Sequence, residues 1–166
     1  MKRNFLDYIH KYSKMKLNLG CGKTNKPEYW GIDVQDLPGV DEVKDLTEGI
    51  PREDKLWDEV FCHDFLEHIP QEECIPIMEE IWRVLKPGGK VIIVFPSTDC
   101  GGQGAFQDPT HLSFWNETKL KYFLHGKYGG LGGLYDSQAW FKPIQIFTYL
   151  NEWHVPYVNA VLEREL

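Results

Sequence analysis

One stretch of the sequence, residues 16–34, constrains the fold more than any other. An apolar run ends in Gly20-Cys21-Gly22, and a second apolar run ends in Asp33. This pattern predicts a buried strand, a sharp glycine turn and a second strand that ends in an acid. Glycine lets the backbone approach a ligand closely, and a carboxylate after the next strand can bind a ribose diol. The stretch therefore indicates a nucleoside site, with an ordinary tight turn between buried strands as the alternative.

The same stretch argues against a dinucleotide as the ligand. A dinucleotide site needs a third glycine and a helix whose N-terminus receives the pyrophosphate. Here Lys23-Thr24-Asn25 follows the second glycine, and Lys26-Pro27 interrupts any helix. Asp33 also follows Gly20 by fewer positions than the roughly 20 of the dinucleotide fingerprint. A ligand with a ribose and no pyrophosphate fits better, and S-adenosylmethionine is such a ligand.

Length, charge and cysteine content narrow the class of protein. The 166 residues are expected to form one domain spanning residues 1–166. The net charge of −7 argues against binding of nucleic acid or anionic membranes. The four cysteines form no C-x-x-C pair and are expected to be reduced thiols in a cytoplasmic protein. The aliphatic run at residues 91–94 is far shorter than the ~20 residues that span a bilayer, so no membrane segment is expected.

Polar residues also follow the next two predicted strands. A short third strand within residues 40–46 ends at Asp45, beside Leu46, and a fourth strand over residues 56–62 leads into His63. In a parallel sheet these positions emerge at the same carboxyl edge as the glycine turn, where open α/β sheets bind ligands. A solvated turn acid is the alternative for Asp45. His63 and His68 have neither the spacing of one helical face nor that of His-Glu-x-x-His, so no metal site is expected.

The remaining periodic segments predict how the sheet is completed. An apolar stripe at helical spacing predicts a helix over residues 74–85, which Pro87-Gly88-Gly89 ends. Residues 90–95 then form a strand buried on both faces. Strands over 144–150 and 157–163 are joined by a connection too short for a crossover helix, so this pair must be antiparallel.

Four motifs now occur in a fixed order along the chain. They are Leu-Asn-Leu-Gly-Cys-Gly at 17–22, Gly-Ile-Asp at 31–33, Leu-Glu-His at 66–68 and Trp-Arg-Val-Leu-Lys-Pro-Gly-Gly at 82–89. The combination resembles the class I S-adenosylmethionine-dependent methyltransferases, and their small single-domain members most closely. The resemblance implies a Rossmann-like three-layer α/β sandwich, with a mostly parallel sheet closed by a C-terminal antiparallel strand pair. The chain departs from the family in one respect, because the helix between the first two strands is reduced to a turn or missing.

The resemblance also implies a set of cofactor-binding residues. They are Leu19, Gly20, Cys21, Gly22, Asp33, Val34, Asp45, Leu46, His63 and Leu66. Gly20 and Gly22 would pack under the cofactor, and Asp33 would hold the ribose hydroxyls. Asp45 and Leu46 would flank the adenine, and His63 would border the methionine part. The family uses its Leu-Glu-His motif largely for packing, so no catalytic role is expected for His68.

The segment after residue 95 is expected to contact the methyl acceptor. A glycine-rich loop over residues 96–108 is too long for a plain connection and is typical of a lid. Phe106, Asp108, His111 and Trp115 are the predicted acceptor-binding residues, and buried core is the alternative for the aromatic ones. If the reaction uses a general base, His111 is the predicted one, with a structural histidine that closes a turn as the alternative.

The predicted function is methyl transfer from S-adenosylmethionine to an oxygen or nitrogen of a small molecule or glycan. A sulfonium methyl group needs in-line approach by a nucleophile, so positioning and exclusion of water supply most of the rate. Methylation of a protein or nucleic-acid chain is one alternative. Another is a non-catalytic subunit that binds S-adenosylmethionine and works with a partner, and a homodimer also fits. A dinucleotide oxidoreductase is the last alternative.

Overall fold

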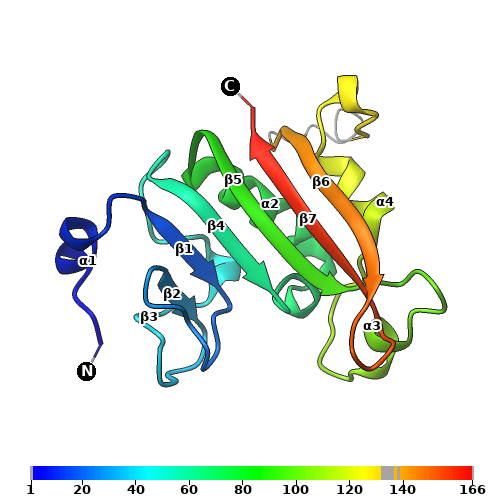
Figure 1. Ribbon diagram of the computed structural model, residues 1–166, viewed down its shortest axis with the longest axis horizontal. Helices are drawn as coiled ribbons and strands as arrows, with labels where there is room; N and C mark the ends of the chain where they lie inside the picture. The colour runs from blue at the N-terminus through cyan, green and yellow to red at the C-terminus, as the bar shows by residue number, and fades with distance from the viewer. Residues whose placement is uncertain (1, 132–136, 138, 166) are drawn as a thin grey trace.

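A computed structural model describes residues 2–131, 137 and 139–165 of the chain. Within these residues the strands form one seven-stranded sheet in the order β3-β2-β1-β4-β5-β7-β6 (Figure 1). The strands are β1 Lys16–Leu19, β2 Trp30–Asp33, β3 Glu42–Val43, β4 Trp57–His63, β5 Leu85–Pro96, β6 Phe141–Leu150 and β7 Pro156–Arg164. The first five are parallel to one another, whereas β7 is antiparallel to both β5 and β6. The predicted mostly parallel sheet with a C-terminal antiparallel pair is confirmed.

The helices are short apart from the one predicted between the fourth and fifth strands. They are α1 Phe5–Lys11, α2 Cys74–Val84, α3 Gln103–Gln107 and α4 Glu117–Leu120. Single 3-10 turns are η1 Leu46–Glu48, η2 Leu66–His68, η3 Gln71–Glu73, η4 Lys121–Phe123 and η5 Gly126–Tyr128. Asn4 caps α1 by accepting a hydrogen bond from the Leu6 amide at 2.8 Å. Helix α2 buries its predicted apolar stripe, including Met78 and Ile81.

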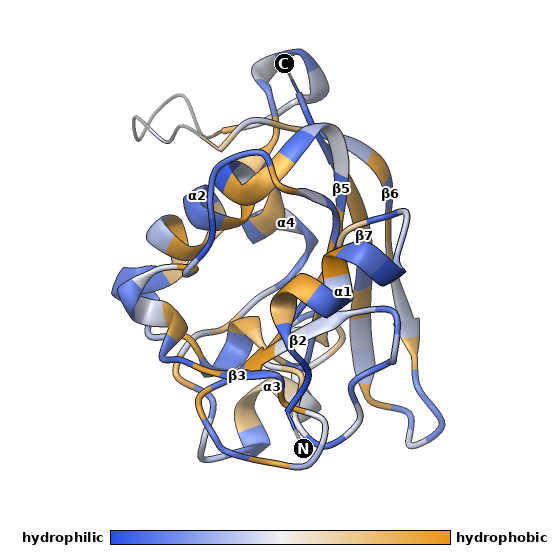
Figure 2. Ribbon diagram, turned by 90° about the vertical axis from the view of Figure 1, so that its left-hand side faces the viewer, coloured by the Kyte–Doolittle hydropathy of each residue, from blue (hydrophilic) through white to orange (hydrophobic). Residues whose placement is uncertain are grey.

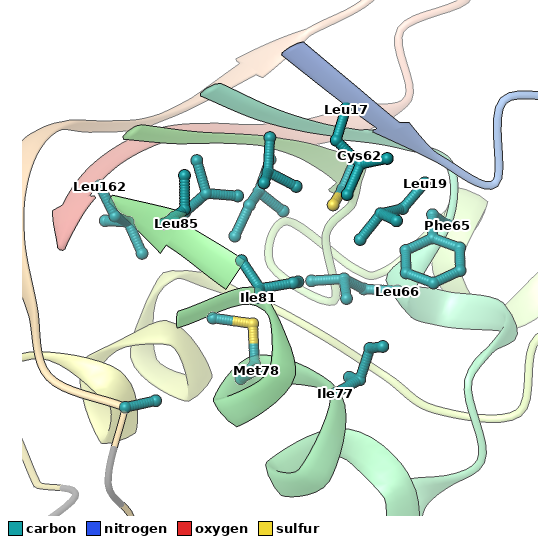
Figure 3. Close-up of a cluster of buried hydrophobic side chains, with 14 of the residues drawn as sticks. Leu17, Leu19, Cys62, Phe65, Leu66, Ile77, Met78, Ile81, Leu85 and Leu162 are labelled. Atoms are coloured by element: carbon teal, nitrogen blue, oxygen red, sulfur yellow. The ribbon is translucent and has the colours of Figure 1, made fainter. Parts of the chain in front are cut away.

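The core lies between one face of the sheet and α2. Because side chains alternate along a strand, every second residue of β1 and β4 points at the helix. Figure 3 shows Leu17, Leu19 and Cys62 of these strands opposite Met78 and Ile81 of α2. All five side chains are fully buried.

The opposite face of the sheet is much less covered. Figures 1 and 2 show α2 and α4 on one side of the sheet, with α1 beyond the ends of β1 and β2. Among the described residues no helix lies on the other side of β4, β5 and β7. The connections at residues 20–29 and 34–41 are too short to hold a crossover helix of the usual length. The fold class is confirmed, including the missing helix between β1 and β2. Helix α1 does not replace it, because Phe5 and Tyr8 pack against Trp30 and Trp57 of the same core that α2 covers.

A buried carboxylate organises the connection that replaces this helix. Asp41 is 8% exposed and accepts hydrogen bonds from Arg3 Nε at 2.6 Å and from the Gly31 amide at 2.8 Å. Asn25 Nδ2 lies 3.2 Å from the same carboxylate, and Asn25 in turn accepts a bond from Asn18 at 3.1 Å. Loop backbone and polar groups withdrawn from water need such partners. The network therefore ties the N-terminal segment and both strand connections to the sheet.

This network predicts a large stability difference between two nearby acids. Asp41→Ala should lower the free energy of unfolding by about 2–3 kcal/mol, because it removes charge-assisted hydrogen bonds from a buried site. Asp36→Ala is the matched control, since Asp36 is exposed and its ion pair with Lys2 lies at the surface. It should cost less than about 1 kcal/mol. Urea denaturation followed by circular dichroism measures both, and equal losses would contradict the role given to Asp41.

Candidate functional site

A cavity of about 410 Å³ opens at the carboxyl edge of β1, β2 and β4. It is lined by Gly20, Asp33, Val34, Gln35, Lys44, Asp45, Leu46, Thr47, Asp64, Phe65, His68, Ile69 and Thr110. Strand β1 pairs with both β2 and β4, so the chain leaves the centre of the sheet in opposite directions at this point. Open α/β sheets bind ligands at such a switch point, and the volume is typical of a small-molecule site.

The glycine turn after β1 forms the floor of the cavity. Gly20 and Gly22 have φ values of +62° and +53°, the left-handed region that favours glycine. A Cβ atom on Gly20 would lie 2.5 Å from the Phe65 ring. The amides of Gly20 and Cys21 both donate to the Ile32 carbonyl, at 2.9 and 3.2 Å. The turn therefore folds back onto β2 and presents bare backbone to the cavity.

Asp33 is fixed at the wall beside this turn. Its Oδ2 accepts a hydrogen bond from the Gly22 amide at 2.9 Å, and its Oδ1 accepts one from the Gln35 amide at 2.9 Å. A carboxylate offers about four lone-pair positions, so two remain for a ligand. The arrangement can receive two hydroxyl groups, as a ribose diol would provide.

Asp45 and Leu46 form the next part of the wall. Asp45 caps η1 by accepting bonds from the amide and hydroxyl of Thr47, at 3.0 and 2.7 Å. These bonds lower the pKa of the Asp45 carboxyl. Leu46 is buried and lies in the same wall as Ile69. Asp45 is therefore a turn acid that caps η1, as its alternative interpretation predicted, and it also lines the cavity. Leu46 and Ile69 give this wall an apolar surface.

The other predicted cofactor residues lie around the cavity without lining it. Leu19, Cys21 and Leu66 are buried behind the wall, and burial raises the pKa of the Cys21 thiol to about 12. Gly22 supports Asp33 through its amide. His63 is half exposed and stacks on Phe61, with ring centroids 6.0 Å apart. Because Cys62 points into the core, Phe61 and His63 belong to the opposite, open face of the sheet.

The predicted acceptor residues divide into two groups. Trp115 is 1% exposed, donates to Ser113 Oγ at 2.8 Å and packs on Phe95, which fits the buried-core alternative for this residue. Phe106 is 58% exposed in α3. The carboxylate of Asp108 is exposed and accepts bonds from the Thr110 amide and hydroxyl, at 2.8 and 2.6 Å, which lower its pKa.

His111 is held by the loop that carries it. Its Nδ1 lies 2.8 Å from the Ala105 carbonyl, and its Nε2 lies 3.8 Å from Oδ2 of Asp108. The side chain is 7% exposed. The carbonyl contact fits the structural alternative for His111, and it also leaves Nε2 as the ring nitrogen with a free lone pair.

Glu67 and His68 are the residues whose placement the sequence reasoning missed. Glu67 is 2% exposed, and neither carboxylate oxygen accepts a hydrogen bond from the described residues. Burial and the neighbouring acids Asp64 and Asp108 raise the pKa of Glu67 to about 8. His68 lines the cavity, and its Nδ1 lies 3.2 Å from the Thr110 carbonyl. The Leu-Glu-His motif was the sequence signal for these two residues, but it does not reveal that Thr110 and His111 of a distant loop lie against them.

The raised pKa of Glu67 predicts a stability change with pH. The carboxyl is protonated in the folded protein up to about pH 8, whereas in the unfolded chain it ionises near the ordinary glutamate pKa of 4.5. Stability is therefore lost as the pH rises from about 4.5 to about 8, because ionisation favours the unfolded chain while the folded state keeps Glu67 protonated. Above about pH 8 the folded state must hold a buried charge. Glu67→Gln should remove that loss and exceed the wild type by about 1–3 kcal/mol at pH 9.

Urea denaturation at pH 5 and pH 9, in buffer with EDTA to keep ions off the carboxylate, measures this difference. Glu59→Gln is the control, because Glu59 is partly exposed on the open face of the sheet and pairs with Lys16. If the free energy of unfolding changes equally with pH in Glu67→Gln and in the wild type, the pKa of the Glu67 carboxyl is not raised by burial.

Comparison with known proteins supports the resemblance to methyltransferases. A family model described as a methyltransferase domain matches residues 23–93. No curated protein sequence matches the chain. A methyltransferase from Methanosarcina mazei that depends on S-adenosylmethionine has a similar structure, with a TM-score of 0.64, 14% identity and complete coverage of both chains. A similar enzyme from Archaeoglobus fulgidus gives a TM-score of 0.64 at 15% identity over 95% of this chain and 90% of its own.

A third structure contains ligands. It is the 1,6-didemethyltoxoflavin-N1-methyltransferase of Burkholderia thailandensis, with bound 1,6-didemethyltoxoflavin and S-adenosylhomocysteine. Its TM-score is 0.66 at 13% identity, over 92% of this chain and 72% of its own. In the described part of the present chain, no helix is long and apolar enough to cross a bilayer. The matched methyltransferase domain and the shared fold support the resemblance to the class I S-adenosylmethionine-dependent methyltransferases, with S-adenosylmethionine as the cofactor.

Proposed function

We propose that residues 1–166 form one domain that transfers the methyl group of S-adenosylmethionine to an oxygen or nitrogen of a small molecule or glycan. The observation that carries this proposal is the fixed carboxylate of Asp33 beside the bare backbone of Gly20, in one cavity. The Asp33 carboxylate can accept hydrogen bonds from the two ribose hydroxyls, and the bare backbone at Gly20 lets the amino-acid part of the cofactor lie close to the turn.

The proposed cofactor contacts follow from the cavity wall. Asp33 receives the ribose hydroxyls, and Leu46 and Ile69 enclose the adenine, with Val34 and Asp45 beside it. Gly20 and Gly22 act through their backbone, and Leu19, Cys21 and Leu66 support the wall from behind. His63, at the carboxyl end of β4, is the proposed border of the methionine part. S-adenosylmethionine is the only reactive group that these contacts require, since its sulfonium already activates the methyl carbon.

The reaction itself needs a positioned nucleophile. A lone pair of the acceptor forms the new bond to the methyl carbon while the carbon–sulfur bond breaks, and sulfur keeps that electron pair in S-adenosylhomocysteine. The loop over residues 97–115 contributes Thr110 to the cavity wall and is the segment that would exclude water when the substrates are bound. His111 is the proposed general base that accepts a proton from the methyl acceptor, because its Nε2 has a free lone pair. Asp108 and Phe106 of the same loop are proposed to contact the acceptor.

A small acceptor is favoured by size and charge. The cavity of about 410 Å³ holds little more than the cofactor and a small partner. The net charge of −7 disfavours nucleic acid. The Burkholderia enzyme, which shares the fold, is named for a small molecule, 1,6-didemethyltoxoflavin. The free cysteines support a cytoplasmic location.

The open face of the sheet supports the second candidate, a subunit completed by a partner or a second copy.

A methyl-transfer screen tests the proposal. The purified chain is incubated with S-adenosylmethionine and separate pools of hydroxylated small molecules, amines, sugars, protein and RNA, and S-adenosylhomocysteine release is measured. Turnover is expected with a small-molecule or sugar pool. Asp33→Ala should lower that turnover at least tenfold, because the cofactor loses its diol acceptor, whereas Asp36→Ala should leave it unchanged. Turnover only with protein or RNA would overturn the acceptor class.

A further inference from the structure

Glu67, His68 and His111 form a cluster at the junction of η2 and the loop after β5. One ligating atom from each of the three side chains lies within 4.8 Å of the other two. The backbone fixes this arrangement, since the amides of Leu112 and Ser113 donate to the Glu67 carbonyl at 2.7 and 3.0 Å. The two imidazole rings meet edge to face, with centroids 5.1 Å apart. The cluster is therefore built by two segments that are held together independently of any ligand.

Both imidazoles are oriented in the way that metal-binding histidines are. The Nδ1 atom of His111 lies 2.8 Å from the Ala105 carbonyl, and that of His68 lies 3.2 Å from the Thr110 carbonyl. A carbonyl can only accept, so each Nδ1 carries the hydrogen and each Nε2 keeps its lone pair. Histidines that ligate metals usually donate their other ring N–H to a carbonyl or carboxylate in this manner.

Glu67 supplies the observation that points to a cation. Its side chain is 2% exposed, and neither oxygen receives a hydrogen bond from the described residues. Buried carboxylates are normally paired or bound to a metal, because an isolated buried charge is costly. The described ion pairs include no lysine or arginine with Glu67. Its acidic neighbours, Asp64 and Asp108, add negative charge instead.

We propose that Glu67, His68 and His111 bind a divalent transition-metal ion such as Zn²⁺. Two imidazoles and one carboxylate are a donor set that suits such ions and leaves positions open for water or a substrate oxygen. The sequence pattern hid this site, because the histidine that joins His68 is distant in the chain. His63, the nearer candidate, stacks on Phe61 on the open face of the sheet.

The position of the cluster suggests what the ion does, and this step rests on the proposed function. His68 and Thr110 line the cavity, so the ion would lie at its rim. An acceptor hydroxyl bound to the ion would lose its proton to water more readily. The resulting oxygen lone pair would form the bond to the methyl carbon as the carbon–sulfur bond breaks toward sulfur. In this arrangement His111 acts as a ligand, and the ion, by lowering the pKa of the bound hydroxyl, takes the place of His111 as the group that promotes loss of the acceptor proton.

Calorimetric titration of the full chain with Zn²⁺ tests the proposal. The protein should carry no affinity tag and should be treated with EDTA and dialysed before the titration. We expect one ion per chain with micromolar or tighter affinity, and at least a tenfold loss of affinity in His111→Asn and His68→Asn. His10→Asn is the matched control, because His10 makes the same Nδ1 contact to a carbonyl, Leu6 at 2.7 Å, on α1. Circular dichroism confirms folding, and exposed His68 can be replaced with little risk to the core.

Two outcomes would overturn the metal site. They are the absence of stoichiometric binding to the folded chain, and equal affinity in wild type, His68→Asn and His111→Asn, which means adventitious binding. Titration of the same samples with S-adenosylhomocysteine in EDTA separates this result from the proposed function. Cofactor binding without Zn²⁺ binding rejects the metal site alone, whereas Zn²⁺ binding without cofactor binding rejects the proposed function and keeps the site.

Discussion

The hydrogen bonds between the glycine turn and the end of β2 are the interaction on which the site depends. The Ile32 carbonyl receives the amides of Gly20 and Cys21, and the Asp33 carboxylate receives the amide of Gly22. Together they close the turn against its neighbouring strand without help from a helix. The floor of the cavity and the acid in its wall are therefore positioned by the same few bonds. A shift of either strand would move both.

The reduced helical layer explains several other features of the chain. With short connections on one side of the sheet, buried backbone and polar groups there must be satisfied by side chains. Asp41, Arg3 and Asn25 provide this in place of helical hydrogen bonds. The same reduction leaves Phe61, Ile92 and other residues of the open face only partly covered. The core consequently relies on the single layer formed by α2 and its neighbours.

Much of the fold could be predicted from the sequence because it is encoded locally. The glycine turn, the acid after β2 and the stripe of α2 each follow from a few adjacent residues. The antiparallel pair follows from the length of one connection. The strand alternation that buries Cys62 could also have placed His63 on the open face. Trp115 could not be assigned, because an aromatic residue after a glycine-rich loop can enter either the core or a pocket.

The cluster of Glu67, His68 and His111 lay beyond sequence reasoning for a different reason. Its members come from η2 and from a distant loop, and only the tertiary hydrogen bonds to the Glu67 carbonyl bring them together. The spacing of residues in the chain carries no information about such a contact. The cofactor edge is a property of the fold, whereas this cluster depends on the particular path of one loop.

The most direct measurement is a calorimetric titration of the folded chain with S-adenosylhomocysteine. We predict one site per chain with micromolar affinity, which Asp33→Ala abolishes and Asp36→Ala retains. A folded wild-type chain that does not bind, or binding that Asp33→Ala leaves unchanged, would contradict the assignment of this cavity as the cofactor site.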